Sequence, residues 1–163
     1  MMTKRLSAAL LAILPAAALL TSAPAAAYRQ PIDNDLSRCD GGRPAVRVTV
    51  TGVRTSTGNI RVQTYRATSA DWLTKGRWLH RIQVPARRGT MTFCLPVSSP
   101  GSYAVAVRHD MNGNGDTDLR SDGGGMSNNP SINIFNLGKP SVSKTAFTVG
   151  NGARAIQITM RYM

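Results

Sequence analysis

Apolar side chains recur at every second position through most of the chain beyond residue 44. In the stretch 45–53, Val46, Val48 and Val50 alternate with an arginine and two threonines. Because successive side chains of a strand point to opposite faces, this alternation predicts a β-strand with one buried face. The same pattern predicts six further strands, over 60–65, 78–84, 90–95, 103–110, 145–149 and 155–162.

Turn-forming residues separate the predicted strands. The turn Thr55-Ser-Thr-Gly-Asn59 predicts a hairpin between the first two strands, and Gly150-Asn-Gly152 predicts another between the last two. Seven short strands with almost no helix indicate an all-β fold, an antiparallel β-sandwich of immunoglobulin-like or transthyretin-like topology. Residues from about 118 to 143 lack a clear pattern, and we expect one long irregular loop there.

The N-terminus has the features of a secretory signal peptide. Lys4 and Arg5 precede an apolar run over 6–20, and a small-residue segment ends at Ala27. We therefore expect cleavage after residue 27, an N-terminal arm over 28–43 and a single domain over 44–163. The product is expected to be periplasmic or extracellular, with no membrane span after cleavage.

The expected mature chain is strongly basic. The full chain has 20 Lys and Arg, so loss of Lys4 and Arg5 leaves 18 against 8 Asp, a net charge of +10. The basic residues are scattered, which is typical of a solvated sheet face; attraction to an anionic glycan or envelope surface is the alternative. Neither an aromatic platform nor helix-turn-helix or zinc-finger spacing accompanies them, so sequence-specific nucleic-acid binding is not expected.

Two cysteines, Cys39 and Cys94, are predicted to form a disulfide, because an even pair in an oxidising compartment is usually bridged. Met91, Phe93 and Leu95 share one face of their strand, so Cys94 is expected to point away from the core. The bridge would then hold the N-terminal arm across the outside of the sandwich.

An acidic stretch after the 103–110 strand is the candidate site. Half of the eight aspartates lie within thirteen consecutive positions, and oxygen-bearing side chains alternate there as in a calcium loop. Ser121 stands where a closing Glu belongs, so we expect weak binding, with a Kd of about 10⁻⁴ to 10⁻³ M. The other interpretation is a run of turns in which Asp and Asn side chains accept from backbone amides. The predicted calcium ligands are Asp110, Asn112, Asn114, Asp116 through its backbone carbonyl, Asp118 and Asp122.

Three residues are expected to support this loop: His109, Gly113 and Gly115. An alternative function is a hydrolase that uses His109 and the 110–127 loop with a serine such as Ser127. Adjacent strand residues face opposite ways, which makes a dyad of His109 with Asp110 geometrically poor, and the chain has no GxSxG motif. The expectation is therefore not an enzyme but an exported binding or structural module whose 110–122 loop binds calcium.

Three segments of the mature chain resemble a secreted bacterial family, domain of unknown function 2141. They are the run from Pro100 to Gly115, the segment Gly125-Met-Ser-Asn-Asn129, and Lys139-Pro-Ser141 followed by Ala146-Phe147. The resemblance covers most of the mature region and implies a small exported β-sandwich with no established activity. Relatives often carry a Gly-Lys-Leu-Asp-like continuation of the loop, where this chain has Asp-Thr-Asp-Leu-Arg over 116–120.

Overall fold

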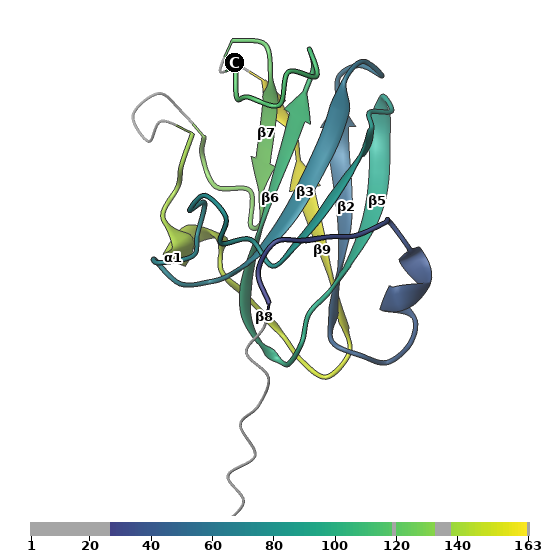
Figure 1. Cartoon of the computed structure of the whole chain (residues 1–163), viewed down its shortest axis with the longest axis vertical. Helices are drawn as coiled ribbons and strands as arrows, with labels where there is room; N and C mark the ends of the chain where they lie inside the picture. The colour runs from purple at the N-terminus through teal and green to yellow at the C-terminus, as the bar shows by residue number, and fades with distance from the viewer. Residues whose placement is uncertain (1–26, 119, 133–137, 163) are drawn as a thin grey trace, which may run out of the picture.

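The structure, a computed structural model, describes residues 27–118, 120–132 and 138–162. These residues form two mixed β-sheets that pack together without closing into a barrel (Figure 1). The predicted all-β sandwich is therefore confirmed. The predicted signal peptide lies outside the described residues except for Ala27. No helix in the described ranges is long and apolar enough to cross a membrane.

The larger sheet has seven strands in the order β1-β4-β3-β6-β7-β10, with β8 paired to β6 beside this path. Its two edges are formed by very short strands. Their bounds are β1 Gln30–Pro31, β3 Asn59–Arg66, β4 His80–Pro85, β6 Gly101–Asp110, β7 Gly123–Met126, β8 Phe147–Val149 and β10 Arg161–Tyr162.

The smaller sheet has three strands, and β2 (Ala45–Val53) lies in its middle. On one side β2 runs antiparallel to β5 (Gly89–Pro96), and on the other it runs parallel to β9 (Ala153–Thr159). Two short helices complete the described elements, the 3₁₀ helix η1 (Leu36–Cys39) and α1 (Val142–Thr145).

The main core lies between the two sheets, where the alternating apolar residues of both meet. Tyr103, Val105 and Val107 of β6 belong to this core, as the alternation predicts, and His109 is buried on the same face. From the smaller sheet Val48 and Phe93 pack against them with no exposed surface. The central strand β6 is therefore held along its whole length before it reaches the acidic loop.

A second apolar cluster covers part of the outer face of the larger sheet. Tyr65 on β3 and Ala104 on β6 lie beneath Trp72 and Trp78 from the connecting segment. The Trp72 indole N–H donates to the carbonyl of Pro140 at 2.8 Å, which ties this segment to the residues before α1. Farther along β6, toward Arg108, the outer face opens into a pocket.

Cys39 and Cys94 form a disulfide with a sequence separation of 55. Both are buried, together with Ala45, in a small cluster of their own outside the main core. Cys94 does face away from the sandwich interior, and η1 covers it. The predicted position of the bridge, across the outside of the sandwich, is therefore the observed one.

Both predicted hairpins are wrong. Strands β2 and β3 lie in different sheets, and so do β8 and β9. Gly58 takes the chain from one sheet to the other at a positive φ of 68°, and a Cβ there would lie 1.9 Å from the carbonyl oxygen of Asp110. Gly150, Asn151 and Gly152 have no positive φ, which the tight two-residue hairpin turns require.

Two further features differ from the sequence prediction. The pairs β2 with β9 and β1 with β4 are parallel rather than antiparallel. The expected irregular loop contains a strand, β7, which pairs with β6 from Ala106 opposite Met126 to His109 opposite Gly123. Three glycines make up most of β7, so no alternation of side chains marks it in the sequence.

Candidate functional site

The acidic loop begins at Asp110, the last residue of β6, which is 2 % exposed. Its carboxylate accepts the backbone N–H of Gly113 and of Gly115, each at 2.9 Å. Both glycines have positive φ values, 71° and 84°, which side-chain-bearing residues rarely adopt. The loop therefore turns back over Asp110 and uses the buried carboxylate as its anchor.

A second buried carboxylate, that of Asp122, closes the loop. Its two oxygens accept the backbone N–H of Met111 at 3.1 Å and of Asp118 at 3.0 Å. Asp122 is 6 % exposed and lies directly before β7. Because it joins the first and last parts of the loop, Asp122 holds the ends of β6 and β7 in register.

Side-chain amides fill the middle of the loop. Asn112 and Asn114 both donate to the same oxygen of Asp118, at 2.7 and 3.0 Å. Their own oxygens accept the backbone N–H groups of Asn114 and Asp116, which makes two successive Asx turns. Asp116 is exposed. Five of the six predicted calcium ligands, all but Asp116, thus use their side chains in hydrogen bonds within the loop.

These contacts give the aspartate cluster a structural role that needs no ion. Three of the four carboxylates accept amide donors, and Asp110 also lies 3.5 Å from the guanidinium of Arg108. Within the described ranges no three His, Cys, Asp or Glu residues form a group suited to a metal ion. Calcium binding by the loop stays a prediction, and the turn interpretation accounts for each of these hydrogen bonds.

His109 lies inside the sandwich with no exposed surface. Its Nε2 is 2.8 Å from the carbonyl oxygen of Thr57, and its Nδ1 is 2.8 Å from the hydroxyl of Tyr162. A carbonyl only accepts, so Nε2 carries a proton, and in the neutral imidazole Nδ1 then accepts from the tyrosine. The Tyr162 hydroxyl in turn accepts the N–H of Arg54, and burial raises the pKa of the Tyr162 phenol, which keeps its proton available. His109 thus ties β6 to the chain before β3 and to β10.

The residues of the alternative hydrolase are not brought together. Ser127 is fully buried, and its hydroxyl donates to the carbonyl of Thr145 at 2.6 Å and accepts the N–H of Val105 at 3.0 Å. Val105 lies four residues before His109 on β6, roughly 13 Å along a strand. Ser127 and His109 therefore hold different parts of the sheet together, and neither side chain faces solvent.

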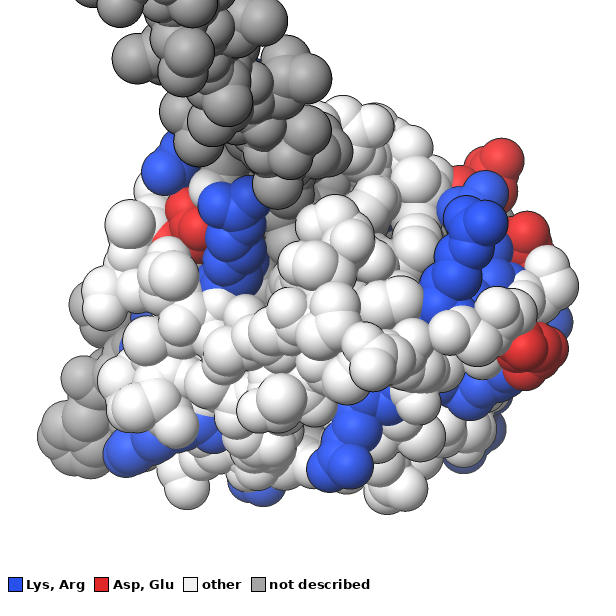
Figure 2. Space-filling model, turned by 90° about the horizontal axis from the view of Figure 1, so that it is seen from below, with Lys and Arg blue, Asp and Glu red and all other residues white. Residues whose placement is uncertain are grey.

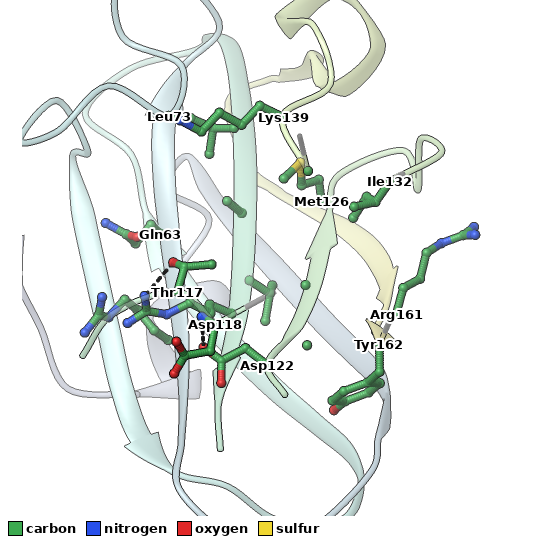
Figure 3. Close-up of a pocket in the computed structure, with 17 residues that line it drawn as sticks. Gln63, Leu73, Thr117, Asp118, Asp122, Met126, Ile132, Lys139, Arg161 and Tyr162 are labelled. Atoms are coloured by element: carbon green, nitrogen blue, oxygen red, sulfur yellow. Dashed lines mark hydrogen bonds between the residues drawn. The ribbon is translucent and has the colours of Figure 1, made fainter. Parts of the chain in front are cut away.

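A pocket of about 390 Å³ lies beside the acidic loop, on the outer face of the larger sheet. Figure 3 shows Thr117, Asp118 and Asp122 on one side of it and Tyr162 on the other. Apolar side chains line its far end, among them Met126 and Ile132. The lining carboxylates of Asp118 and Asp122 already accept hydrogen bonds from amide groups of the loop.

Basic residues cross the pocket in register. Arg61 on β3 is directly opposite Arg108 on β6, Arg108 is opposite Gly124 on β7, and Gly124 is opposite Arg161 on β10. Cross-strand partners share one face of a sheet, so the row presents three guanidinium groups around a glycine. Burial, followed by the nearby charges of Arg108 and Arg81, lowers the pKa of Arg61 below the usual arginine value.

Gly124 keeps the pocket open. A Cβ at this position would meet only Ile132, at 3.9 Å, whereas a Cβ at Gly123 would lie 2.4 Å from the ring of Tyr162. At Gly125 it would lie 2.6 Å from Ile158. Gly125 thus allows the two sheets to pack, Gly123 leaves room for the ring of Tyr162 on the neighbouring strand β10, and Gly124 lines the pocket.

Sequence reasoning assigned Arg61 and Arg108 to a solvated sheet face and did not identify the pocket. Alternation places each of them on the outer face of its own strand, but nothing in the sequence states that β3 and β6 are neighbours in this register. Figure 2 shows the lower end of the molecule, where Lys and Arg lie in separate places rather than in a continuous patch. The row of Arg61, Arg108 and Arg161 is therefore more informative about a site than the overall positive charge of the chain.

The family profile described as "Uncharacterized protein conserved in bacteria (DUF2141)" matches residues 48–157. The chain belongs to this family, and the resemblance seen in the sequence is confirmed. No curated protein and no solved structure matches the chain.

Proposed function

We propose that this member of the DUF2141 family is an exported, non-catalytic binding module whose ligand occupies the pocket beside the acidic loop. The observation that carries the proposal is the pocket itself, about 390 Å³ in volume, with an apolar end and a few charged groups around it. Small-molecule sites have this size and this combination of linings.

The wall of the pocket supports a binding role because it is held rigidly. Arg108 donates to the hydroxyl of Thr117 at 2.8 Å and to the carbonyl of Gly115 at 2.7 Å. Asp118 and Asp122, which also line the pocket, are fixed by hydrogen bonds within the loop. A preformed wall lowers the entropy cost of holding a ligand.

The chemistry around the pocket favours binding over catalysis. Strand β6 borders the pocket with its outer face. His109 lies on the inner face of this strand, and both of its ring nitrogens take part in hydrogen bonds. Ser127 is likewise buried and bonded. The proposal therefore assigns both residues to the architecture of the sheet.

Export to the periplasm or the extracellular space is part of the proposal. The N-terminal charge and hydropathy pattern supports it, as does the disulfide between Cys39 and Cys94, which is compatible with an oxidising compartment. In that setting an anionic envelope component or glycan is the proposed partner. Mass spectrometry of the protein recovered from the producing cells is expected to show an N-terminus at Tyr28.

A pair of fluorescent probes tests the pocket. The neutral N-phenyl-1-naphthylamine and its sulfonate, 1-anilinonaphthalene-8-sulfonate, share one ring system that brightens in an apolar site. We expect saturable binding of at least one probe to the mature protein, with loss of that binding in Gly124→Leu. The added side chain would extend into the pocket, where a Cβ meets only Ile132.

Gly150→Leu is the matched control, because Gly150 has open space around it and no positive φ. It lies just after β8, which pairs with the start of β6 and not with the part of β6 that borders the pocket. This variant is expected to bind like the parent, and Gly124→Ala to bind less strongly. The proposal is wrong if neither probe binds the folded parent saturably, or if Gly124→Leu melts and binds as the parent does.

A calcium-binding loop is the second candidate function, and one observation favours it. Asn112, Asn114 and Asp118, three of the predicted ligands, meet at a single carboxylate oxygen. To bind an ion, the side-chain amides of Asn112 and Asn114 would have to turn their oxygens toward it, which would break the two Asx turns. We therefore propose at most weak calcium binding, as the sequence predicts.

A further inference from the structure

We infer that the ligand of this pocket is an amphipathic anion, with a carboxylate, phosphate or sulfate group held by the arginine row and an apolar part against Met126 and Ile132. This inference rests on the proposed function, since it names the chemical class of the ligand for the same pocket. It is carried by the register of the basic residues and by the way in which the lining carboxylates are already bonded.

The first step is that the arginine row lowers the stability of the sheet. Arg61 and Arg108 are direct cross-strand partners, and like charges in this position destabilise a sheet. Arg61 donates to the side-chain oxygen of Gln83 at 2.8 Å, and no ion pair of Arg61 occurs among the described residues. Arg81 adds to this repulsion, because its charge follows burial and the charge of Arg108 among the causes that lower the pKa of Arg61. An arrangement that costs stability is typical of a site that an anion completes.

The second step is the balance of charge in the lining. Among the described residues, four basic side chains line the pocket, those of Arg61, Arg108, Lys139 and Arg161, against the two carboxylates of Asp118 and Asp122. Asp122 accepts two backbone N–H groups, and Asp118 accepts two side-chain amides. These bonds hold both carboxylates in the loop, so two positive charges are left in excess.

The third step separates the roles of the arginines. The terminal nitrogens of Arg108 donate to Thr117 and Gly115 and pair with the carboxylate of Asp110, so Arg108 positions the loop against the sheet. Its Nε is buried and has no hydrogen-bond partner in the part of the chain that the structure describes. Arg61 and Arg161 flank it in the row, and in Figure 3 Arg161 extends outward from the rim. The groups left for a ligand are therefore Arg61, Arg161 and Lys139.

The fourth step concerns the apolar part of the ligand. Met126 lies opposite Ala106 on the sheet and belongs to the second apolar cluster, against which Leu73 and Ile132 pack. All four residues line the pocket, at the end away from Asp122. A ligand that reaches from Gly124 to Met126 thus meets the arginine row at one end and apolar side chains at the other, where Figure 3 also shows Lys139 beside Leu73.

The same probe pair tests the inference, because the two probes differ only by a sulfonate. At low salt we expect the mature protein to bind the sulfonate at least about tenfold more tightly than the neutral probe, a size typical of a charge-assisted hydrogen bond. This preference is expected to shrink at 0.5 M salt, since partly exposed charges are screened. Equal affinities for the two probes would overturn the inference and leave the proposed function standing, whereas no binding of either would remove both.

Variants assign the preference to the row. Arg61→Gln is expected to lower the sulfonate preference about fivefold or more while the melting temperature stays equal or rises, because the repulsion with Arg108 is relieved. Arg161→Gln and Lys139→Gln are expected to add to the loss. Arg154→Gln is the matched control, because Arg154 is exposed on β9, in the other sheet. An unchanged preference in the triple variant would contradict the inference, as would a loss of stability in Arg61→Gln that explains its weaker binding.

Displacement of the sulfonate probe distinguishes the sources of such an anion. Decanoate is expected to displace the probe and decanol, of the same chain length, is not; equal displacement by both would overturn the anion requirement. Sedimentation with phosphatidylglycerol vesicles then separates a lipid headgroup from a free amphiphile. If the parent protein sediments with the vesicles and Arg61→Gln does not, the lipid headgroup is the source of the anion. If decanoate displaces the probe but the parent does not sediment with the vesicles, the source is a free amphiphile.

Discussion

Gly123, Gly124 and Gly125 form most of a β-strand although glycine weakens strands, and each residue has a different structural reason for lacking a side chain. A Cβ at Gly123 would clash with the ring of Tyr162, a Cβ at Gly125 would clash with Ile158 and crowd the backbone of Thr159, and Gly124 lines the pocket. The sequence shows the three residues together but not what lies against each. A β-strand here is therefore not predictable from alternation, because alternation needs side chains.

This difference gives a prediction for two adjacent residues. Gly125→Ala would place a Cβ 2.6 Å from Ile158 and 3.2 Å from a backbone oxygen, and is expected to lower the free energy of unfolding by about 1 to 3 kcal/mol. Gly124→Ala meets no atom closer than 3.9 Å and is expected to change it by less than about 1 kcal/mol. Urea denaturation measures both. Equal losses in the two variants would show that the packing assigned to Gly125 is wrong.

His80 gives a prediction for pH dependence. Burial, followed by the charge of Arg38, lowers the pKa of His80 in the folded protein, and the backbone of Pro96 partly opposes this. The unfolded chain therefore binds more protons, so the stabilising contribution is present above about pH 6.5 and is lost as the pH falls through the folded-state pKa. We expect the free energy of unfolding to fall from pH 7 to pH 5, and to fall less in His80→Gln. Identical pH profiles for the two proteins would contradict this role, since His109 is present in both.

At the scale of the elements, alternation identifies strands but not their partners. It located β2, β3, β5 and β6 within a residue or so at most ends, because each buries one face in the main core. It assigned β2 and β3 to a hairpin, whereas Gly58 carries the chain across the sandwich. Pairing depends on contacts between residues far apart in sequence, and a single chain does not display these.

The motif at 125–129 shows the same limit. Its residues resemble a family pattern, but their partners lie in other elements: Ser127 bonds to β6, Asn128 donates to the carbonyl of Ala146, and Asn129 bonds to β9. Asn129 donates to the carbonyl of Gln157 and accepts the N–H of Thr159, so it covers the open edge of β9 as a neighbouring strand would. The segment therefore joins the two sheets, a role that follows from geometry and not from residue type.

The acidic loop gives the prediction that belongs to this scale. With a Kd of about 1 mM, 10 mM calcium stabilises the folded protein by about 1.4 kcal/mol, which raises Tm by about 4 °C. We expect Asp118→Asn to abolish this rise, because Asp118 is the residue on which Asn112 and Asn114 converge. Asp116→Asn is the control: it is the same substitution two residues away, at a position whose predicted ligand is the backbone carbonyl. The absence of a rise in the parent at 10 mM calcium, or equal rises in all three proteins, would leave the loop as turns alone.

At the scale of the whole molecule, the N-terminal arm is attached to the sandwich at several separated places. Gln30 and Pro31 pair with β4, and the hydroxyl of Tyr28 donates to the buried carboxylate of Asp71. The side chain of Asn34 donates to the carbonyl of Thr92 and accepts the N–H of Cys94. The sequence indicated an arm and its bridge, because cysteine pairing and turn residues are local signals. It did not indicate that the arm adds a strand to the larger sheet.

The disulfide is expected to provide the largest single stabilising constraint on this arrangement. A bridge across 55 residues restricts the unfolded chain enough to contribute about 4 kcal/mol in the chain-entropy model. Reduction of the native protein, or the double variant Cys39→Ser and Cys94→Ser, is therefore expected to lower the free energy of unfolding by about that amount, with some further loss because Cys94 is fully buried. Reductant added to the double variant is the control and should change nothing.

The pocket lies on the other sheet, so the reduced protein, where it stays folded, is expected to bind the sulfonate probe with unchanged affinity. Loss of probe binding on reduction without unfolding would show that the arm and the pocket are coupled across the sandwich.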